Sequence, residues 1–182
     1  MFRLVFIRKK KIQNKEYAYI VENRWKKRVS KGSKKGARQK VKGYLGRVHR
    51  PEARQDVDFF SHFSIANVED YIANNEKITI IKDLVRFELI RHGFEEAGKL
   101  LSNEDIFFDL DSNEFFAKDN KAKKIVLELN EGFMCKETIE NLLNLKVRGG
   151  EDAGYKLANA FVEAGIAVPK EVFVGFFSKV FK

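Results

Sequence analysis

A long basic segment near the start of the chain constrains this sequence more than any other feature. Residues 23–51, NRWKKRVSKGSKKGARQKVKGYLGRVHRP, contain twelve Lys and Arg and no Asp or Glu. A solvated surface normally mixes both signs, because like charges with no acidic neighbours repel one another. A polyanion would remove that repulsion. We therefore interpret the segment as a nucleic-acid surface, with a solubilising loop or a surface for an acidic protein as the alternatives.

The charge of the chain is divided unevenly between its two parts. Residues 1–56 hold 19 basic and 4 acidic side chains, a net charge of +15, whereas residues 57–182 hold 16 basic and 22 acidic ones, a net charge of −6. Such asymmetry is typical of a basic binding module joined to a body with another role. We therefore predict two domains, a basic β-sheet module over residues 1–56 and an α+β, partly helical body over residues 57–182.

The apolar pattern predicts three strands in the first part, over residues 3–8, 16–25 and 38–48. Lys9–Lys11 and Gln13–Asn14 are predicted to form the turn between the first two strands. Residues 30–37, SKGSKKGA, predict a flexible connection between the second and third strands. These strands would form a small antiparallel sheet, which needs a helix or a partner to cover it.

The body begins with a predicted connector over residues 51–58. A short helix is expected over residues 65–73 with Ser64 as its N-cap, followed by a stronger helix from Thr79 to the stop at Gly93. The other elements predicted for the body are a hairpin over residues 105–117, a strand over 124–129, and three helices over 137–145, 152–164 and from Pro169 onward. The predicted fold class is therefore α+β, with a small basic three-stranded sheet and a mixed body that ends in a three-helix unit.

The last helix has the clearest apolar stripe in the sequence. The stripe comprises Val172, Phe173, Phe176, Phe177, Val180 and Phe181. This spacing predicts a helix that packs along one face. Its partner is either the C-terminal core or another protein chain, so a homodimer or a protein-partner contact through this helix is one of the two expectations.

Ten basic side chains are predicted to contact phosphates. Each Lys or Arg that meets a phosphate releases condensed counterions, and strands can enter a groove as they do in some DNA-binding proteins. The predicted contacts are Arg24, Lys26, Lys27, Arg28, Lys31, Lys34, Lys35, Arg38, Lys40 and Lys42.

Aromatic residues of the same segment offer a second mode of binding. Tyr17, Tyr19, Trp25 and Tyr44 could stack on splayed bases of RNA. Because Tyr17 and Tyr19 share a strand face with Val21, packing within the sheet is the favoured interpretation for these two side chains.

The same strands resemble a known family. The residues Tyr17-Ala-Tyr19-Ile-Val21-Glu22, then Trp25, then Arg38-Gln39-Lys40-Val41-Lys42 and Tyr44-Leu45-Gly46-Arg47 resemble the short N-terminal β segment of some DDE-class insertion-sequence transposases. The resemblance covers about a fifth of the chain and implies a DNA-side role for this sheet. It implies no activity, because the catalytic core of those enzymes needs three separated carboxylates on an RNase H-like fold, and the rest of this chain is too short and too helical to supply one.

We predict a non-enzymatic protein that binds nucleic acid through phosphate contacts, and the resemblance slightly favours DNA over RNA. The alternative is a factor associated with ribosomal RNA. A second alternative is a Mg²⁺-dependent nuclease in which Asp109, Asp111 and Glu128 hold the metal. The competing interpretation of Asp109 and Asp111 is a hairpin turn whose side chains bond the local backbone.

The remaining candidates for chemistry predict no site. His49, His62 and His92 are spread along the chain, and Cys135 stands alone beside Phe133 and Met134. We therefore assign no metal site and no cofactor, and we interpret Cys135 as a small buried residue. No apolar run approaches the roughly 18 residues of a membrane span, and a single cysteine excludes an internal disulfide. These features favour a cytoplasmic protein with no membrane partner.

Overall fold

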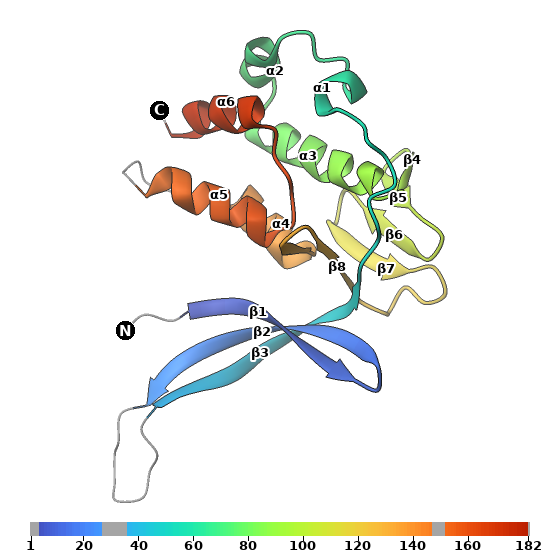
Figure 1. Ribbon diagram of the computed structural model, residues 1–182, viewed down its shortest axis with the longest axis vertical. Coiled ribbons are helices and arrows are strands. Elements are labelled where there is room, and N and C mark those ends of the chain that lie inside the picture. Colours follow the sequence, from blue (N-terminus) through green and yellow to red (C-terminus); the bar gives the residue numbers. More distant parts are fainter. Residues whose placement is uncertain (1–3, 27–35, 147–151, 182) are drawn as a thin grey trace, which may run out of the picture.

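The computed structural model describes residues 4–26, 36–146 and 152–181 and shows an α+β protein (Figure 1). The elements follow in the order β1 (Leu4–Ile12), β2 (Lys15–Lys26), β3 (Gly36–His49), α1 (Phe59–His62), α2 (Val68–Asn74), α3 (Lys77–Arg91), β4 (Glu95–Ala97), β5 (Leu100–Ser102), β6 (Ile106–Asp109), β7 (Glu114–Ala117), β8 (Ile125–Leu129), β9 (Gly132–Met134), α4 (Lys136–Leu143), α5 (Ala153–Glu163) and α6 (Lys170–Val180).

The three basic strands belong to a larger sheet. Its strand order is β1-β2-β3-β8-β9, and β3 pairs in parallel with β8 through residues 47–49. A second, four-stranded sheet has the order β4-β5-β6-β7. The predicted three-stranded antiparallel sheet is therefore present, but it continues into strands from the body. The domain boundary near residue 56 stays a prediction.

The first strand is longer than its sequence pattern suggested. Lys9–Lys11 were predicted as a turn, yet β1 continues to Ile12, and Lys10 and Lys11 lie opposite Tyr17 and Glu16 of β2. The turn is confined to Gln13 and Asn14, which have positive φ angles of 46° and 61°. Three consecutive lysines suggested the end of the strand, but pairing with β2 keeps them in an extended conformation.

The first helices of the body also differ from the prediction. α2 begins at Val68, and the side chain of Asn67 accepts hydrogen bonds from the backbone N–H groups of Glu69 and Asp70. Asn67 is therefore the N-cap, whereas Ser64 has a φ of 52° and lies before the helix. The short helix α1 was not predicted, because four residues are too few to show a helical period.

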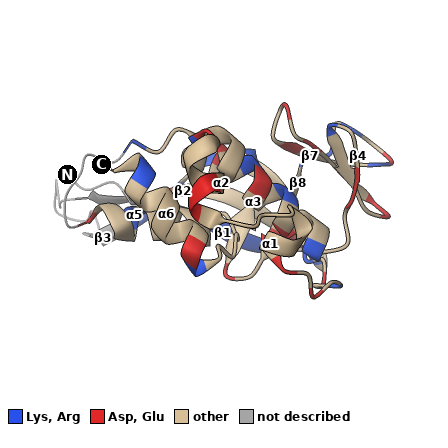
Figure 2. Cartoon of the chain, turned by 90° about the horizontal axis from the view of Figure 1, so that it is seen from above, with Lys and Arg blue, Asp and Glu red and all other residues tan. Residues whose placement is uncertain are grey.

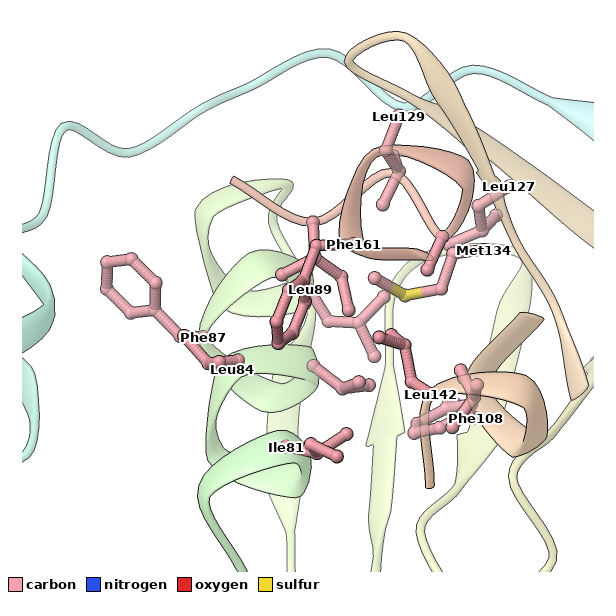
Figure 3. Packing of buried hydrophobic residues seen from close by; sticks show 14 of the residues in the cluster. Ile81, Leu84, Phe87, Leu89, Phe108, Leu127, Leu129, Met134, Leu142 and Phe161 are labelled. Atoms are coloured by element: carbon pink, nitrogen blue, oxygen red, sulfur yellow. The ribbon is translucent and has the colours of Figure 1, made fainter. Parts of the chain in front are cut away.

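The main hydrophobic core lies between α3, the second sheet and the C-terminal helices. Figure 3 shows Leu84 and Leu89 of α3 near Met134 of β9 and Phe161 of α5. α6 contributes Val172 and Phe176, both fully buried, and the other members of its stripe pack against this core. The stripe on the last helix is thus used within the chain. A homodimer or partner contact through α6 stays a prediction.

A smaller core joins the basic strands to the body. It consists of Ala18, Leu45, Val48, Val126 and Cys135. Gly46 allows the approach of β3 to β8, because a Cβ at that position would lie only 2.7 Å from the backbone carbonyl carbon of Lys124. The tertiary contact between the basic strands and β8 therefore requires a glycine here.

Candidate nucleic-acid interface

The predicted phosphate contacts fall into three groups. Arg38, Lys40 and Lys42 lie on β3 and are exposed. Arg24 and Lys26 lie at the end of β2, where only the backbone is described. Five further residues lie outside the described part of the chain: Lys27, Arg28, Lys31, Lys34 and Lys35. We call residues 22–26 and 36–42, from the paired ends of β2 and β3, the basic hairpin.

The strand register of the basic hairpin sets two like charges against each other. Arg24 lies directly opposite Arg38, and Glu22 lies opposite Lys40. Like charges directly opposite each other destabilise an antiparallel pair. The register therefore makes two basic residues direct cross-strand neighbours, and a bound anion would stabilise that arrangement.

Lys42 differs from the other cations of the hairpin. It lies at an irregularity in the pairing of β2 with β3, and its Nζ is 3.5 Å from Oε2 of Glu22, a side chain only 2% exposed. A buried carboxylate needs a nearby opposite charge. Lys42 therefore contributes to the structure of the hairpin, which its sequence position did not indicate.

The basic strands have two distinct faces. One face carries Ala18 and Leu45, which pack in the smaller core. The opposite face carries Tyr17, Tyr19 and Tyr44, which we call the tyrosine face. The ring of Tyr44 lies 5.5 Å from that of Tyr19 and 6.2 Å from that of Tyr17, measured between centroids, with tilted planes.

The tyrosine face corrects the prediction that Tyr17 and Tyr19 pack within the sheet core. Both are only half-buried and neither belongs to the residues that pack against the smaller core, while Tyr44 is 46% exposed. The irregularity in the β2–β3 pairing at Ala18/Tyr19 sets Tyr44 opposite Tyr19 and so brings rings from both strands together. The alternation of residues along each strand could not predict that Tyr44 lies beside Tyr17 and Tyr19, because it does not record the register shift.

Cations border the tyrosine face on both sides. Arg8 and Lys10 of β1 lie opposite Tyr19 and Tyr17, and Arg47 of β3 lies opposite Tyr17 from the other side. All three cations are exposed. Burial and the neighbouring tyrosines raise the pKa of Tyr44, so its hydroxyl is neutral at physiological pH. The face therefore combines neutral aromatic rings with positive charge.

Ion pairs on the opposite side of the basic strands link these strands to the body. Nζ of Lys9 lies 2.6 Å from Oε1 of Glu128 on β8, and Nε of Arg50 lies 2.7 Å from Oε2 of the same carboxylate. Arg50 also donates to Glu16, and this bond lowers the pKa of Glu16. These pairs fix the basic strands on β8 and leave the tyrosine face outward.

The three carboxylates proposed for a nuclease have other partners. Oδ1 of Asp109 accepts a hydrogen bond from the backbone N–H of Asp111, and Oδ2 accepts one from the hydroxyl of Ser112. Asp111 pairs with Lys99 at 2.7 Å, and Glu128 lies in the other sheet. Asp109 thus serves the hairpin turn. Across residues 4–26, 36–146 and 152–181, no three His, Cys, Asp or Glu side chains gather as metal ligands would.

Cys135 is buried in the smaller core, as its apolar neighbours suggested. Burial raises the pKa of its thiol to about 12. The Sγ atom lies 3.6 Å from the Thr138 hydroxyl at the start of α4. A thiol with this pKa is protonated at neutral pH and is not a nucleophile.

His49, at the end of β3, is expected to titrate below 6.5, the value of an unperturbed histidine. Burial is the main cause of its lowered pKa, the charge of Arg47 adds to it, and Asp105 partly opposes both. Because the folded pKa is depressed, the unfolded chain takes up a proton first as the pH falls below 6.5, and the folded state loses stability there. NMR titration of the imidazole ring would measure the pKa of His49, with a His49→Gln variant to assign the resonance. A midpoint at or above 6.5 would contradict it.

Two further findings bear on what this interface serves. Within the described residues, no helix combines the length and the apolar character needed to cross a membrane. Comparison of the chain with protein-family models, with curated proteins and with solved structures found no significant match.

Proposed function

We propose that this protein binds nucleic acid without cleaving it and that the basic hairpin contacts the phosphate backbone. The observation that carries this proposal is the register of β2 and β3, which places Arg24 opposite Arg38. Arg38 and Lys40 of β3 are both exposed. Phosphates neutralise such clustered cations and release counterions on binding. A hairpin stabilised for its own sake would place opposite charges at these positions.

The position of the basic hairpin supports the same proposal. In Figure 1 the end of β2 and the start of β3 extend away from the helices. Figure 2, viewed from above the helices, shows acidic and basic segments mixed over the body. A ligand with dense negative charge would therefore meet the hairpin before the body. Antiparallel ribbons of this kind fit the major groove of duplex DNA.

DNA is slightly favoured over RNA as the target. The reason is the resemblance of residues 17–47 to the N-terminal β segment of DDE-class transposases. A factor associated with ribosomal RNA remains the alternative, because the same cations would neutralise any phosphate backbone. The Asp109, Asp111 and Glu128 contacts described above give no support to the nuclease alternative.

The test is binding of the full chain to duplex DNA, duplex RNA and single strands over a series of salt concentrations, with EDTA present. If six to ten phosphates are contacted, the logarithm of the binding constant should fall against the logarithm of salt with a slope of roughly −5 to −9 on duplex DNA. A flat slope, or no binding, would mean that the basic hairpin serves an acidic protein. Recovery of intact nucleic acid after parallel incubation with Mg²⁺ would separate binding from cleavage.

A further inference from the structure

We propose that the tyrosine face and the groove beside it form a site for an unpaired nucleotide, so that the ligand is a nucleic acid with a single-stranded segment. This inference rests on the proposed function and specifies its substrate class. Its starting point is the juxtaposition of three tyrosine rings, exposed cations and a groove on the face of the sheet that points away from the smaller core.

The groove runs between the tyrosine face and the segment that links β7 to β8. Its volume is about 820 Å³, and Tyr17, Tyr44 and Arg47 line it from the sheet, while Lys118 and Lys124 line it from the other side. Sites for small ligands usually measure roughly 300–1,000 Å³. The groove is therefore large enough for a base with its sugar and phosphate.

The charge within the groove suits a phosphate. Five of the residues that line it are Lys or Arg and two are Asp. Asp119 pairs with Lys123 on the same segment, and Asp105 is the other acid. Among the described residues, Lys15, Arg47 and Lys124 pair with no carboxylate, so their charges are available to an anion. Arg47 also donates its backbone N–H to the carbonyl of Lys124 at 3.0 Å, which joins the two walls.

The rings supply what a base requires. Tyr44 is 46% exposed and lies beside Tyr17 and Tyr19, whose rings support it from the same face. Aromatic side chains next to a positive groove are the usual means by which proteins hold single strands, since every base has a π-face. In a duplex the base faces are stacked on one another and cannot reach a tyrosine, so the ring cluster favours unpaired bases.

The experiment measures the affinity of the full chain for a single strand of about 12 nucleotides, a length within known site sizes, and for the matching duplex. Tyr44→Leu is expected to weaken single-strand binding about tenfold to a hundredfold with no change in salt slope. Tyr44→Phe should bind like the wild type, because its ring is kept.

Arg47→Gln should reduce the single-strand salt slope by about 0.7. Tyr155→Leu, a 71% exposed tyrosine on α5, is the matched control and should have no effect.

The outcomes separate this inference from the proposed function. If the wild type binds no nucleic acid, the proposed function fails, and this inference fails with it. If the wild type binds but Tyr44→Leu retains single-strand affinity, or Tyr44→Phe loses it equally, only the nucleotide site is overturned.

Photocrosslinking of wild-type protein to an iodouracil-containing strand gives a readout that needs no variant. Adducts on Tyr17, Tyr19 or Tyr44 are expected, and adducts found only elsewhere would contradict the site.

Discussion

Replacement of Arg24, Arg38 and Lys40 by Gln is expected to weaken duplex binding several hundredfold at about 0.1 M salt and to reduce the salt slope by about 2.7, if each cation meets one phosphate. The loss of the opposition between Arg24 and Arg38 should raise the stability of this variant. The loss of Lys40, which lies opposite the buried Glu22, should lower it, so the unfolding temperature should stay close to that of the wild type. Lys42 is kept, because its replacement would remove a cation that pairs with the buried Glu22. Fluorescence anisotropy over a salt series and thermal unfolding measure the two effects.

The matched control removes the same amount of charge from the body. Lys146, Lys156 and Lys170 are exposed, and replacing all three by Gln changes the net charge equally. If binding depends on the hairpin, this control should retain a salt slope within experimental error of the wild type. An equal loss in both variants would show that only the overall charge of the protein matters. No loss in the hairpin variant would exclude these three residues as phosphate contacts.

Replacement of Glu88 by Ala is expected to lower the free energy of unfolding by about 3–5 kcal/mol, because Arg91 and two hydrogen-bond donors would lose their buried carboxylate partner. Glu88 of α3 is fully buried. Its Oε1 accepts a hydrogen bond from Nδ2 of Asn130 at 3.1 Å, and its Oε2 accepts one from the backbone N–H of Ala167 at 3.0 Å. One carboxylate thus ties α3 to the β8–β9 turn and to the segment between α5 and α6.

The loss would be a large share of the total stability, which for a domain is about 5–15 kcal/mol. Glu88→Gln should cost less, because the amide keeps an acceptor oxygen for one of the two donors. Glu95→Ala, on the exposed strand β4, is the control and should stay within about 0.5 kcal/mol of the wild type. Urea unfolding followed by circular dichroism measures all three. A Glu88→Ala variant as stable as the control would show that the carboxylate is not needed.

The elements of this protein were largely predictable because their patterns are local. The strands β2 and β3, the hairpin of β6 and β7, and the helices α3 to α6 follow from alternation, from helical spacing and from turn residues. The elements that were missed are short. α1 has four residues and β4, β5 and β9 have three each, and so few residues cannot show a period.

The candidate site was only half visible in the sequence. The clustered charge of residues 23–51 was evident, because composition needs no knowledge of contacts. The structure placed five of the ten predicted phosphate contacts within described strands, and it added Arg8, Lys10 and Arg47, whose relation to the tyrosines depends on strand pairing. The sequence did hold a signal for the tyrosine face, since Tyr17, Tyr19 and Tyr44 all lie in predicted strands close to Lys or Arg residues.

The sequence by itself determined the α+β class and the basic character of the first 56 residues, from which an anionic partner is predicted. These properties depend on composition and on neighbours along the chain. Only the tertiary structure decided which face carries the tyrosines, that β3 continues into β8, and that Glu88 lies at the centre of a buried network. The physical reason is that strand register, bulges and burial arise from contacts between residues far apart in the chain, and no local pattern records them.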